Sequence, residues 1–143
     1  MILRKGRESD LKNVYNIEVM AYEKPYWSQN MLFEVLANKT DKRLWIYEVD
    51  NDDVGFIIDM RHKDEISLLN IAIHKYLQGM GHGLKMLKKY IKSLPGKCSI
   101  YLEVNKNNIK ALNMYAKLNF EKVSIRKSYY PDGGDAINMQ LVK

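Results

Sequence analysis

The sequence contains a single cysteine and no long hydrophobic run. Cys98 is the only cysteine among 143 residues, so no internal disulfide can form, and we expect a buried thiol in a reducing compartment. No apolar stretch approaches the roughly 20 residues of a membrane span, and residues 1–4 run directly into polar sequence rather than into a signal-peptide core. These absences predict a cytoplasmic protein.

Motifs for metal binding and for covalent catalysis are also missing. His62, His74 and His82 lie before or beside one glycine-rich turn, but no H-x₃₋₅-H or cysteine pair accompanies them, so zinc is not expected. There is no serine nucleophile elbow and no Cys–His pair in a recognisable context. We therefore expect no metal, and direct transfer without an acyl-enzyme for any group-transfer chemistry.

Length and composition are those of one ordinary globular domain, expected over residues 1–143. The chain is 46% apolar and 28% charged, and its 23 Lys and Arg against 17 Asp and Glu give a net charge of +6. A positive field favours polyanionic partners such as a nucleotide cofactor or a ribosome, although a lysine-rich surface explains it equally well. Clustered arginines are absent, so specific nucleic-acid binding is disfavoured as the main function.

Apolar periodicity predicts two helices before the first turn of a strand meander. Ser9 or Asp10 can cap a helix whose apolar side carries Leu11, Val14, Ile17 and Ala21, and Ser28 can cap a second helix. Polar turns at residues 51–53 and 63–64 separate three consecutive strands, which predicts an antiparallel meander.

The second half of the chain alternates strands with two further helices. One helix starts at Gly83 and ends before Pro95, and Asn107 can cap another that holds Tyr115 and Leu118. The predicted fold class is α/β (α+β), a mixed sheet in the order β-α-α-β-β-β-α-β-α-β-β with no repeat or linker. The expected strands are residues 2–4, 44–49, 54–60, 65–73, 99–104, 120–129 and 136–142.

The run Ile71, Ala72 and Ile73 leads into a glycine-rich turn and then into a lysine-rich amphipathic segment. Backbone N–H groups at a helix N-terminus form a cradle for a pyrophosphate. The spacing Q-x-x-G-x-G differs from the dinucleotide and phosphate-loop fingerprints, so it points to coenzyme A rather than to NAD or ATP. An ordinary strand-to-helix turn is the alternative. The turn consists of Gln78, Gly79, Met80, Gly81, His82 and Gly83.

Three polar residues follow at positions suited to a ligand and its chemistry. Glu103 lies near the end of a predicted strand, and Asn108 and Tyr115, seven residues apart, share a helix face about 10 Å apart along the axis. Acyl transfer from a thioester to an amine needs a base for the ammonium proton and an acid for the leaving thiolate. A carboxylate and a phenol are suitable groups, although each residue taken singly could be a solvated carboxylate or a core aromatic.

With these motifs in order, nearly the whole chain resembles the GNAT family of acetyltransferases, through its element order and the Q/R-x-x-G-x-G/A turn. Within that family it is similar to the RimI-type protein N-terminal acetyltransferases of bacteria and archaea. The similarity to this type rests on residues 69–73, residues 102–104, Asn108, Tyr115 and residues 126–131. The paired tyrosines in the last segment are the more discriminating motif.

The resemblance implies a GNAT fold, acetyl-CoA as cofactor and a protein N-terminus as substrate. Backbone groups of residues 71–73 would hold the pantetheine arm and the acetyl carbonyl, and amides of residues 78–83 the pyrophosphate. Asn108 and Tyr115 would contact the cofactor, with Glu103 as base through water and Tyr115 as acid. Two loops would grip the first residues of a peptide, formed by Lys24, Pro25, Tyr26 and Trp27 and by Tyr129 and Tyr130.

The chain departs from the family pattern at three positions. Lys75 stands where many relatives have proline, Gly134 where a glutamate is expected, and Lys24 where an aromatic residue is frequent. The last two lie in or near the expected peptide site, so they concern substrate preference rather than acetyl-CoA binding.

Two other functions remain open at this point. A small-amine acetyltransferase, acting for example on a polyamine, would share the cofactor half of the fold. A non-catalytic basic module could bind RNA or a partner protein through Lys85, Lys88, Lys89 and Lys92 and keep acetyl-CoA only as a ligand, although such a stripe is usually a solvated helix face.

Overall fold

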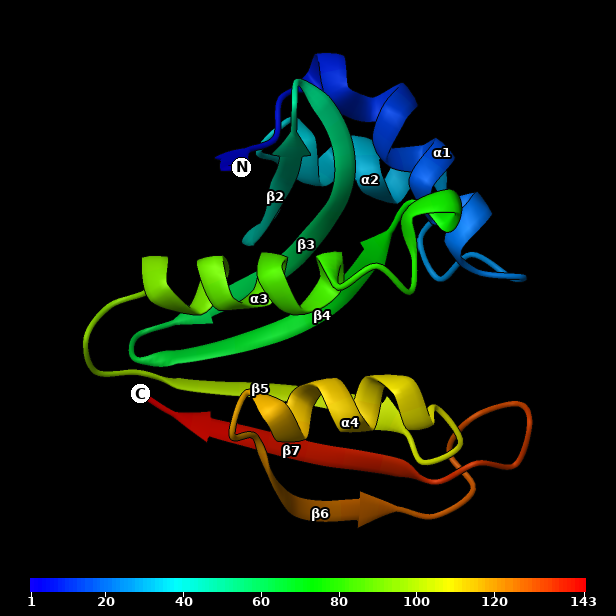
Figure 1. The fold of residues 1–143 in the computed structure, drawn as a ribbon, viewed down its shortest axis with the longest axis vertical. Helices are drawn as coiled ribbons and strands as arrows, with labels where there is room; N and C mark the ends of the chain where they lie inside the picture. The colour runs from blue at the N-terminus through cyan, green and yellow to red at the C-terminus, as the bar shows by residue number, and fades with distance from the viewer. The chain divides into compact units, whose positions relative to one another are not determined.

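The structure is a computed structural model that describes residues 1–143. It contains two compact units, Met1–Met60 with Asn70–Ser93 and Arg61–Leu69 with Leu94–Lys143. Seven strands follow one another in the sheet order β1-β2-β3-β4-β5-β7-β6, with β4–β5 parallel and β1–β2, β2–β3, β5–β7 and β6–β7 antiparallel (Figure 1). The expected mixed, mostly antiparallel sheet with helices is confirmed. A single domain over residues 1–143 stays a prediction.

The elements alternate as the sequence predicts, with two additional 3-10 turns, η1 and η2. The strands are β1 (Ile2–Lys5), β2 (Lys42–Val49), β3 (Asp52–His62), β4 (Glu65–Ile73), β5 (Ser99–Asn105), β6 (Glu121–Arg126) and β7 (Ala136–Val142). The helices are η1 (Glu8–Asp10), α1 (Leu11–Ala21), α2 (Gln29–Leu36), η2 (Lys75–Leu77), α3 (His82–Ser93) and α4 (Ile109–Lys117).

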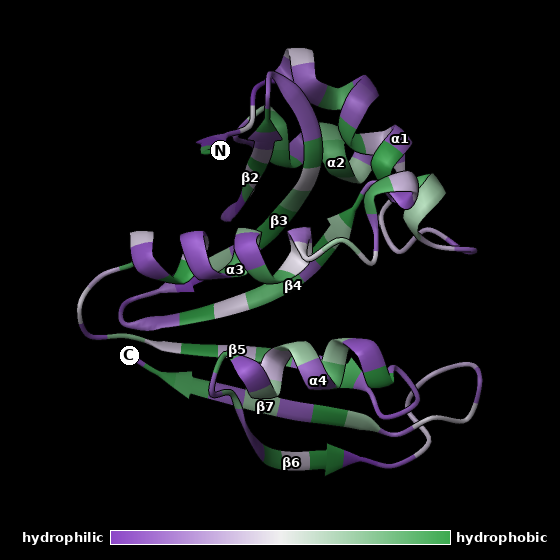
Figure 2. Ribbon diagram, in the orientation of Figure 1, coloured by the Kyte–Doolittle hydropathy of each residue, from purple (hydrophilic) through white to green (hydrophobic).

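In the first unit, β3 is buried on both faces because helices cover both. Phe56 and Ile58 join one apolar cluster with residues of α1 and α2. Strand alternation turns Asp59 to the opposite face, where Tyr90 of α3 donates its hydroxyl to the Asp59 carboxylate. Figure 2 shows α3 banded in hydrophobic and hydrophilic residues, as expected for a helix that buries one side.

A hydrogen-bond network surrounds the Asp59 carboxylate inside this unit. Arg43 donates from Nε to Oδ1 at 2.9 Å and from Nη2 to Oδ2 at 2.7 Å, while its guanidinium lies 5.3 Å from the centre of the Trp45 ring. The indole Nε1 of Trp45 donates to the same carboxylate at 3.4 Å. Together with the Tyr90 hydroxyl, these donors satisfy a charge that has no exposed surface.

Gly55 lets β3 and β4 approach closely, and we expect Gly55→Ala to destabilise the fold. A Cβ there would lie 2.6 Å from the Ala72 carbonyl oxygen and 2.7 Å from Cδ1 of Ile73. Because a backbone atom cannot swing aside, the overpacking should cost about 1–3 kcal/mol of unfolding free energy. Urea unfolding measures it, with Gly96→Ala as the matched control since a Cβ at Gly96 meets nothing within 4 Å. Equal stability of the two variants would contradict the expectation.

In the second unit, β5 separates an apolar face from a polar one. Ile100, Leu102 and Val104 are buried, and α4, the only helix of this unit, covers their side of β5 and β7 (Figure 1). The alternate positions, Tyr101 and Glu103, turn to the other face. There, neighbouring strands contribute polar side chains, for example Gln140, which donates to the Tyr101 hydroxyl at 3.1 Å.

Two expectations near the N-terminal half are wrong in detail. The first hairpin turn consists of Asp50 and Asn51, both with positive φ (52° and 69°), so Asp52 and Asp53 already belong to β3. Asp10 precedes α1 but makes no side-chain cap, because its carboxylate accepts from Arg4 and from the Arg7 N–H instead. Ser28 is confirmed as the cap of α2, since its Oγ accepts from the Met31 N–H at 3.1 Å.

Two expectations in the second half also differ from the structure. Asn108 caps α4, accepting from the Ala111 N–H at 3.2 Å, while Asn107 donates its N–H to the Asn105 side chain. Strand β6 ends at Arg126 and not at residue 129, because Ser128 adopts a positive φ of 50° that turns the chain out of the sheet.

None of the helices is long and apolar enough to cross a membrane.

Candidate active site

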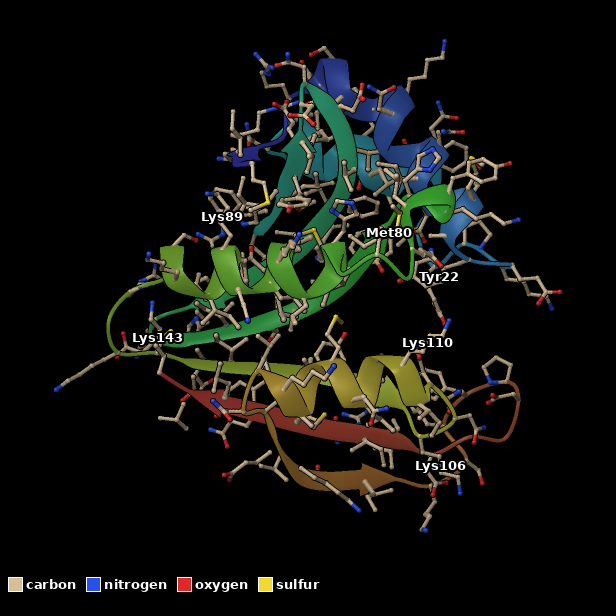
Figure 3. All side chains as sticks on the ribbon, in the orientation of Figure 1. Tyr22, Met80, Lys89, Lys106, Lys110 and Lys143 are labelled. Atoms are coloured by element: carbon tan, nitrogen blue, oxygen red, sulfur yellow. The ribbon has the colours of Figure 1, made fainter.

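The glycine-rich turn before α3 presents a row of free backbone donors. The N–H of Lys85 donates to the Gly81 carbonyl at 3.2 Å, whereas the N–H groups of residues 79–84 have no acceptor in the protein. Gly79 and Gly81 have φ values of 79° and 85°, and a Cβ on either would meet nothing within 4 Å. Met80, between them, is exposed and lies beside the start of α3 (Figure 3). The turn therefore combines free backbone donors with open space beside its two glycines.

The same turn fits an anionic group. It lies at the N-terminus of α3, a helix of 12 residues, where the aligned peptide dipoles supply about half a positive charge. Nδ1 of His82 is buried and has no hydrogen-bond partner, so this turn also holds an unpaired polar side-chain atom. Unpaired amides at a helix N-terminus are suited to a phosphate or diphosphate. The pyrophosphate site at Gln78, Gly79, Met80, Gly81, His82 and Gly83 stays a prediction, and the Gln78 N–H is not available for it because it donates to the Lys75 carbonyl at 3.4 Å.

The end of β4 has an edge without a strand partner. β4 pairs with β5 in parallel from Glu65 to Ser67, and the pairing ends there. Beyond that point the Ile71 carbonyl accepts from the Tyr22 hydroxyl, and the Ile73 carbonyl accepts from Nε2 of Gln78 at 2.9 Å. Because the N–H and C=O of one strand residue point to the same side, the N–H groups of Ile71 and Ile73 also face this edge. Those N–H groups are the donors that a ligand carbonyl would use.

Glu103 lies on the polar face of β5, where Arg126 of β6 is its ion-pair partner. Nη2 of Arg126 lies 3.5 Å from Oε1 of Glu103, whose side chain is 33% exposed. The same guanidinium lies 5.4 Å from the centre of the Tyr129 ring. Arg126 thus connects the candidate base with one of the two predicted peptide-binding tyrosines, and the partial exposure leaves Glu103 open to water.

Tyr115 lies in the interior of the second unit, on the opposite side of β5 from Glu103. It is 7% exposed, and its ring makes an edge contact with Phe120 at 5.7 Å between centroids. Burial raises the pKa of the Tyr115 hydroxyl above the ordinary value of 10.0, and the neighbouring Tyr130 raises it further. The hydroxyl is therefore protonated near neutral pH and can donate a proton.

Asn108 has a structural role in addition to its predicted cofactor contact. Its Oδ1 caps α4, which leaves the side-chain NH₂ group and the second lone pair of Oδ1 to meet a ligand. Asn108 and Tyr115 lie on the same helix segment, as the seven-residue spacing predicts.

The first predicted peptide loop is exposed except for its last residue. Lys24 and Pro25 are exposed, and Tyr26 is 63% exposed with its ring 4.9 Å from that of Tyr22. Trp27 is partly buried against the core of α1 and α2. The loop therefore has an exposed aromatic side chain, Tyr26, next to a residue, Trp27, that is packed against the core.

The second predicted peptide loop, residues 128–135, is held by two aspartates. Asp135 accepts from the Ser128 N–H at 2.9 Å, and Asp132 accepts from the Gly134 N–H at 2.8 Å and from the Asn105 side chain at 3.1 Å. A Cβ at Gly134 would lie only 2.3 Å from Oδ1 of Asn105. The glycine that departs from the family pattern thus leaves room for this arrangement.

We expect acid to weaken the hydrogen bonds that both aspartates make in this loop. The Ser128 N–H, then Lys127 and Lys106, lower the pKa of Asp135, and the Gly134 N–H, then Asn105 and Asn107, lower the pKa of Asp132, both from 3.8. A lowered pKa means that the carboxylates stabilise the loop above pH 3.8, a contribution lost as pH falls through the lower folded values. In an NMR titration, the Ser128 and Gly134 amide shifts should change below pH 3.8.

Asp135→Asn provides the control for that titration. It should abolish the change at Ser128 and leave the change at Gly134, because Asp132 is untouched. A Gly134 amide that stops titrating in this variant would show that the two aspartates do not act separately.

Sequence reasoning missed Glu18 and Arg126. Glu18 is fully buried in α1, and its carboxylate accepts from Asn70 and from the loop of residues 24–27. The spacing of apolar residues could have revealed Glu18. Glu18 follows Val14 by four residues and therefore lies on the apolar side of the helix, where an acidic residue is unusual. Nothing in the local sequence marked Arg126 as the partner of Glu103.

Comparison with known proteins identifies the family. The pattern of the acetyltransferase (GNAT) family matches residues 11–120. The chain belongs to this family. A [ribosomal protein bS18]-alanine N-acetyltransferase of Haemophilus influenzae is 37% identical to this GNAT protein over 134 residues, which are 91% of this chain and 88% of that one.

Solved structures agree with this assignment. The crystal structure of the ribosomal-protein-S18-alanine N-acetyltransferase from Escherichia coli matches with a TM-score of 0.87 at 30% identity, covering 99% of this GNAT chain and 92% of that chain. A chimeric spermidine N-acetyltransferase from Vibrio cholerae matches with a TM-score of 0.83, but its 22% identity shows the fold alone. The expected RimI-type resemblance and the enzyme class, an N-acetyltransferase, are confirmed. Use of acetyl-CoA is a general property of this family.

Proposed function

We propose that this GNAT enzyme acetylates the α-amino group of protein N-termini, including that of a ribosomal protein or of nascent chains. The observation that carries the proposal is the loop of residues 128–135, which is held by two aspartates and has its Tyr129 ring beside Arg126, the ion-pair partner of Glu103. Relatives at 30% identity or more that are named as alanine N-acetyltransferases of ribosomal protein S18 support it. Its cytoplasmic location stays a prediction.

The backbone N–H groups without an acceptor would bind the cofactor. Acetyl-CoA would supply the acetyl group as a thioester. The N–H groups of residues 79–84 would bind its pyrophosphate, since they lack any other acceptor. The N–H groups of Ile71 and Ile73 would meet the pantetheine arm and the acetyl carbonyl, and the Asn108 side chain would add a further contact.

Glu103 and Tyr115 would divide the proton transfers between them. Glu103, partly exposed, would accept a proton from the substrate ammonium through water. An α-amino group has a pKa of about 7.7–8.0, so a weak base acting through water is sufficient. Tyr115 would then donate its retained proton to the leaving sulfur. The amine attacks directly, and no acyl-enzyme is required.

Two aromatic loops would hold the peptide. Tyr26 and Tyr129 are 63% and 53% exposed, and Lys24, Pro25, Trp27 and Tyr130 complete the two loops. Large exposed aromatic side chains are typical of peptide-binding surfaces. A small amine such as a polyamine would leave these rings without a role.

Mass analysis of acetylated peptides tests the proposal. We would incubate the protein with acetyl-CoA and peptides that differ only in the first residue, beginning with alanine, and locate the acetyl group by fragmentation. A single acetyl group on the α-nitrogen is expected. Acetylation confined to lysine side chains, or to spermidine offered in parallel, would overturn it.

A blocked peptide is the matched control. The same sequence with a formylated α-nitrogen and one internal lysine should remain unmodified. Acetylation of that lysine at an equal rate would show that the enzyme does not distinguish the two kinds of amine.

A further inference from the structure

We propose that Glu18 is a positioning residue that fixes the first peptide loop against the end of β4, so that substrate binding depends on a carboxylate remote from the reacting atoms. The proposal rests on the proposed function, because it assigns residues 24–27 to the peptide. Glu18 lies in the third turn of α1, has no exposed surface, and forms no ion pair with any lysine or arginine.

Glu18 supplies the hydrogen bonds that hold this loop. No backbone–backbone hydrogen bond involves residues 23–27. Instead, Oε2 of Glu18 accepts from the Tyr26 N–H at 2.7 Å and from the Trp27 N–H at 3.1 Å. The backbone amides of two predicted peptide-binding residues therefore share one acceptor oxygen, and without it both would be unsatisfied.

The other oxygen of the same carboxylate connects the loop with β4. Oε1 accepts from Nδ2 of Asn70 at 2.8 Å, and Asn70 is itself buried. The next residue of β4 is Ile71, whose carbonyl accepts from the hydroxyl of Tyr22 at the start of the loop. One side chain thus sets the distance between the loop and the strand edge proposed to hold the acetyl carbonyl.

The choice of a carboxylate has a physical reason. An ionised carboxylate accepts several hydrogen bonds at once and binds N–H donors more strongly than a neutral oxygen does. Three N–H donors converge on the two carboxylate oxygens of Glu18. A glutamine can still accept from the Tyr26 and Trp27 amides, so it should preserve most of the loop geometry, whereas alanine removes every acceptor.

Steady-state kinetics of three variants test the assignment. We expect Glu18→Ala to raise the KM for an alanine-starting peptide about tenfold, because two backbone amides lose their acceptor, and to leave the KM for acetyl-CoA within about twofold. Glu18→Gln should rescue most of the effect. The matched control is Val14→Ala, which removes a buried side chain one turn earlier on α1 that belongs to the apolar cluster.

Amide hydrogen exchange gives a readout that does not need activity. In the unliganded protein, the Tyr26 and Trp27 amides should exchange about tenfold faster or more in Glu18→Ala than in Val14→Ala. Equal exchange, or a peptide KM that rises no more than in Val14→Ala, would overturn the role of Glu18. If the unaltered protein acetylates no peptide, the proposed function fails, and faster exchange in Glu18→Ala would then still support the loop-anchoring role alone.

Discussion

Tyr115→Phe is expected to lower kcat for peptide acetylation by about 10²–10⁴-fold, the range of a lost general acid. The substitution removes only the hydroxyl, and the Phe ring keeps the edge contact with Phe120 in the interior of the second unit. Burial raises the pKa of Tyr115, so its proton is retained throughout the working pH range and is available to the leaving sulfur. Initial rates with saturating acetyl-CoA measure the effect.

The pH dependence of Glu103→Gln distinguishes the role of Glu103 as base from that of Tyr115 as acid. The loss of rate in this variant should be larger at pH 7 than at pH 9, because the substrate α-amine, with a pKa of about 7.7–8.0, needs less help once it is already neutral. The Tyr115→Phe loss should be the same at both values, since the raised pKa keeps that tyrosine protonated across this interval. Two parallel pH profiles would mean that Glu103 and Tyr115 do not have the separate roles proposed.

Asp59→Ala is expected to reduce the free energy of unfolding by about 3–5 kcal/mol, the usual cost of breaking a buried ion pair. The Asp59 carboxylate has no exposed surface and accepts from Arg43, Trp45 and Tyr90. Its removal takes away the acceptor that the partly exposed Arg43 and Trp45 share with the buried Tyr90 and breaks the ion pair with Arg43. Since domains are stable by only about 5–15 kcal/mol, the variant should unfold at a much lower urea concentration.

Tyr90→Phe is the matched control for that measurement. It removes one donor from the same carboxylate and keeps the ring, so it should cost about 1–2 kcal/mol. If Asp59→Ala were no more destabilising than Tyr90→Phe, the bond to Arg43 would contribute little to stability.

The fold was predictable because its elements have clear periods. Val14 and Ile17, three residues apart on the predicted apolar side of α1, are buried. Ile100 and Leu102 are buried in β5, as the apolar, β-branched composition of that segment predicts. The residues that begin and end each element were not predictable, because several polar residues could serve as each helix cap or turn. Asp10 could cap α1, but Arg4 and the Arg7 amide take its carboxylate, and only their positions in space reveal this.

The candidate site was predictable where a motif has its own backbone chemistry. The glycine spacing at residues 78–83 predicts open amides, and the structure has them at residues 79–83, whereas the Gln78 N–H donates to the Lys75 carbonyl at 3.4 Å. Partners from distant parts of the chain could not be predicted: Glu18 and Asn70 are 52 residues apart, and Arg126 reaches Glu103 from another strand. The roles of Glu103 and Tyr115 stay predictions.

The open amides of the turn before α3 also have a consequence for the choice of buffer. Backbone N–H groups recognise negative oxygen atoms and do not read the rest of a molecule, so sulfate or inorganic phosphate can compete for the donors of residues 79–84. Such ions should raise the apparent KM for acetyl-CoA in proportion to their concentration. Rates compared between laboratories would then differ with the salt used, even for identical protein.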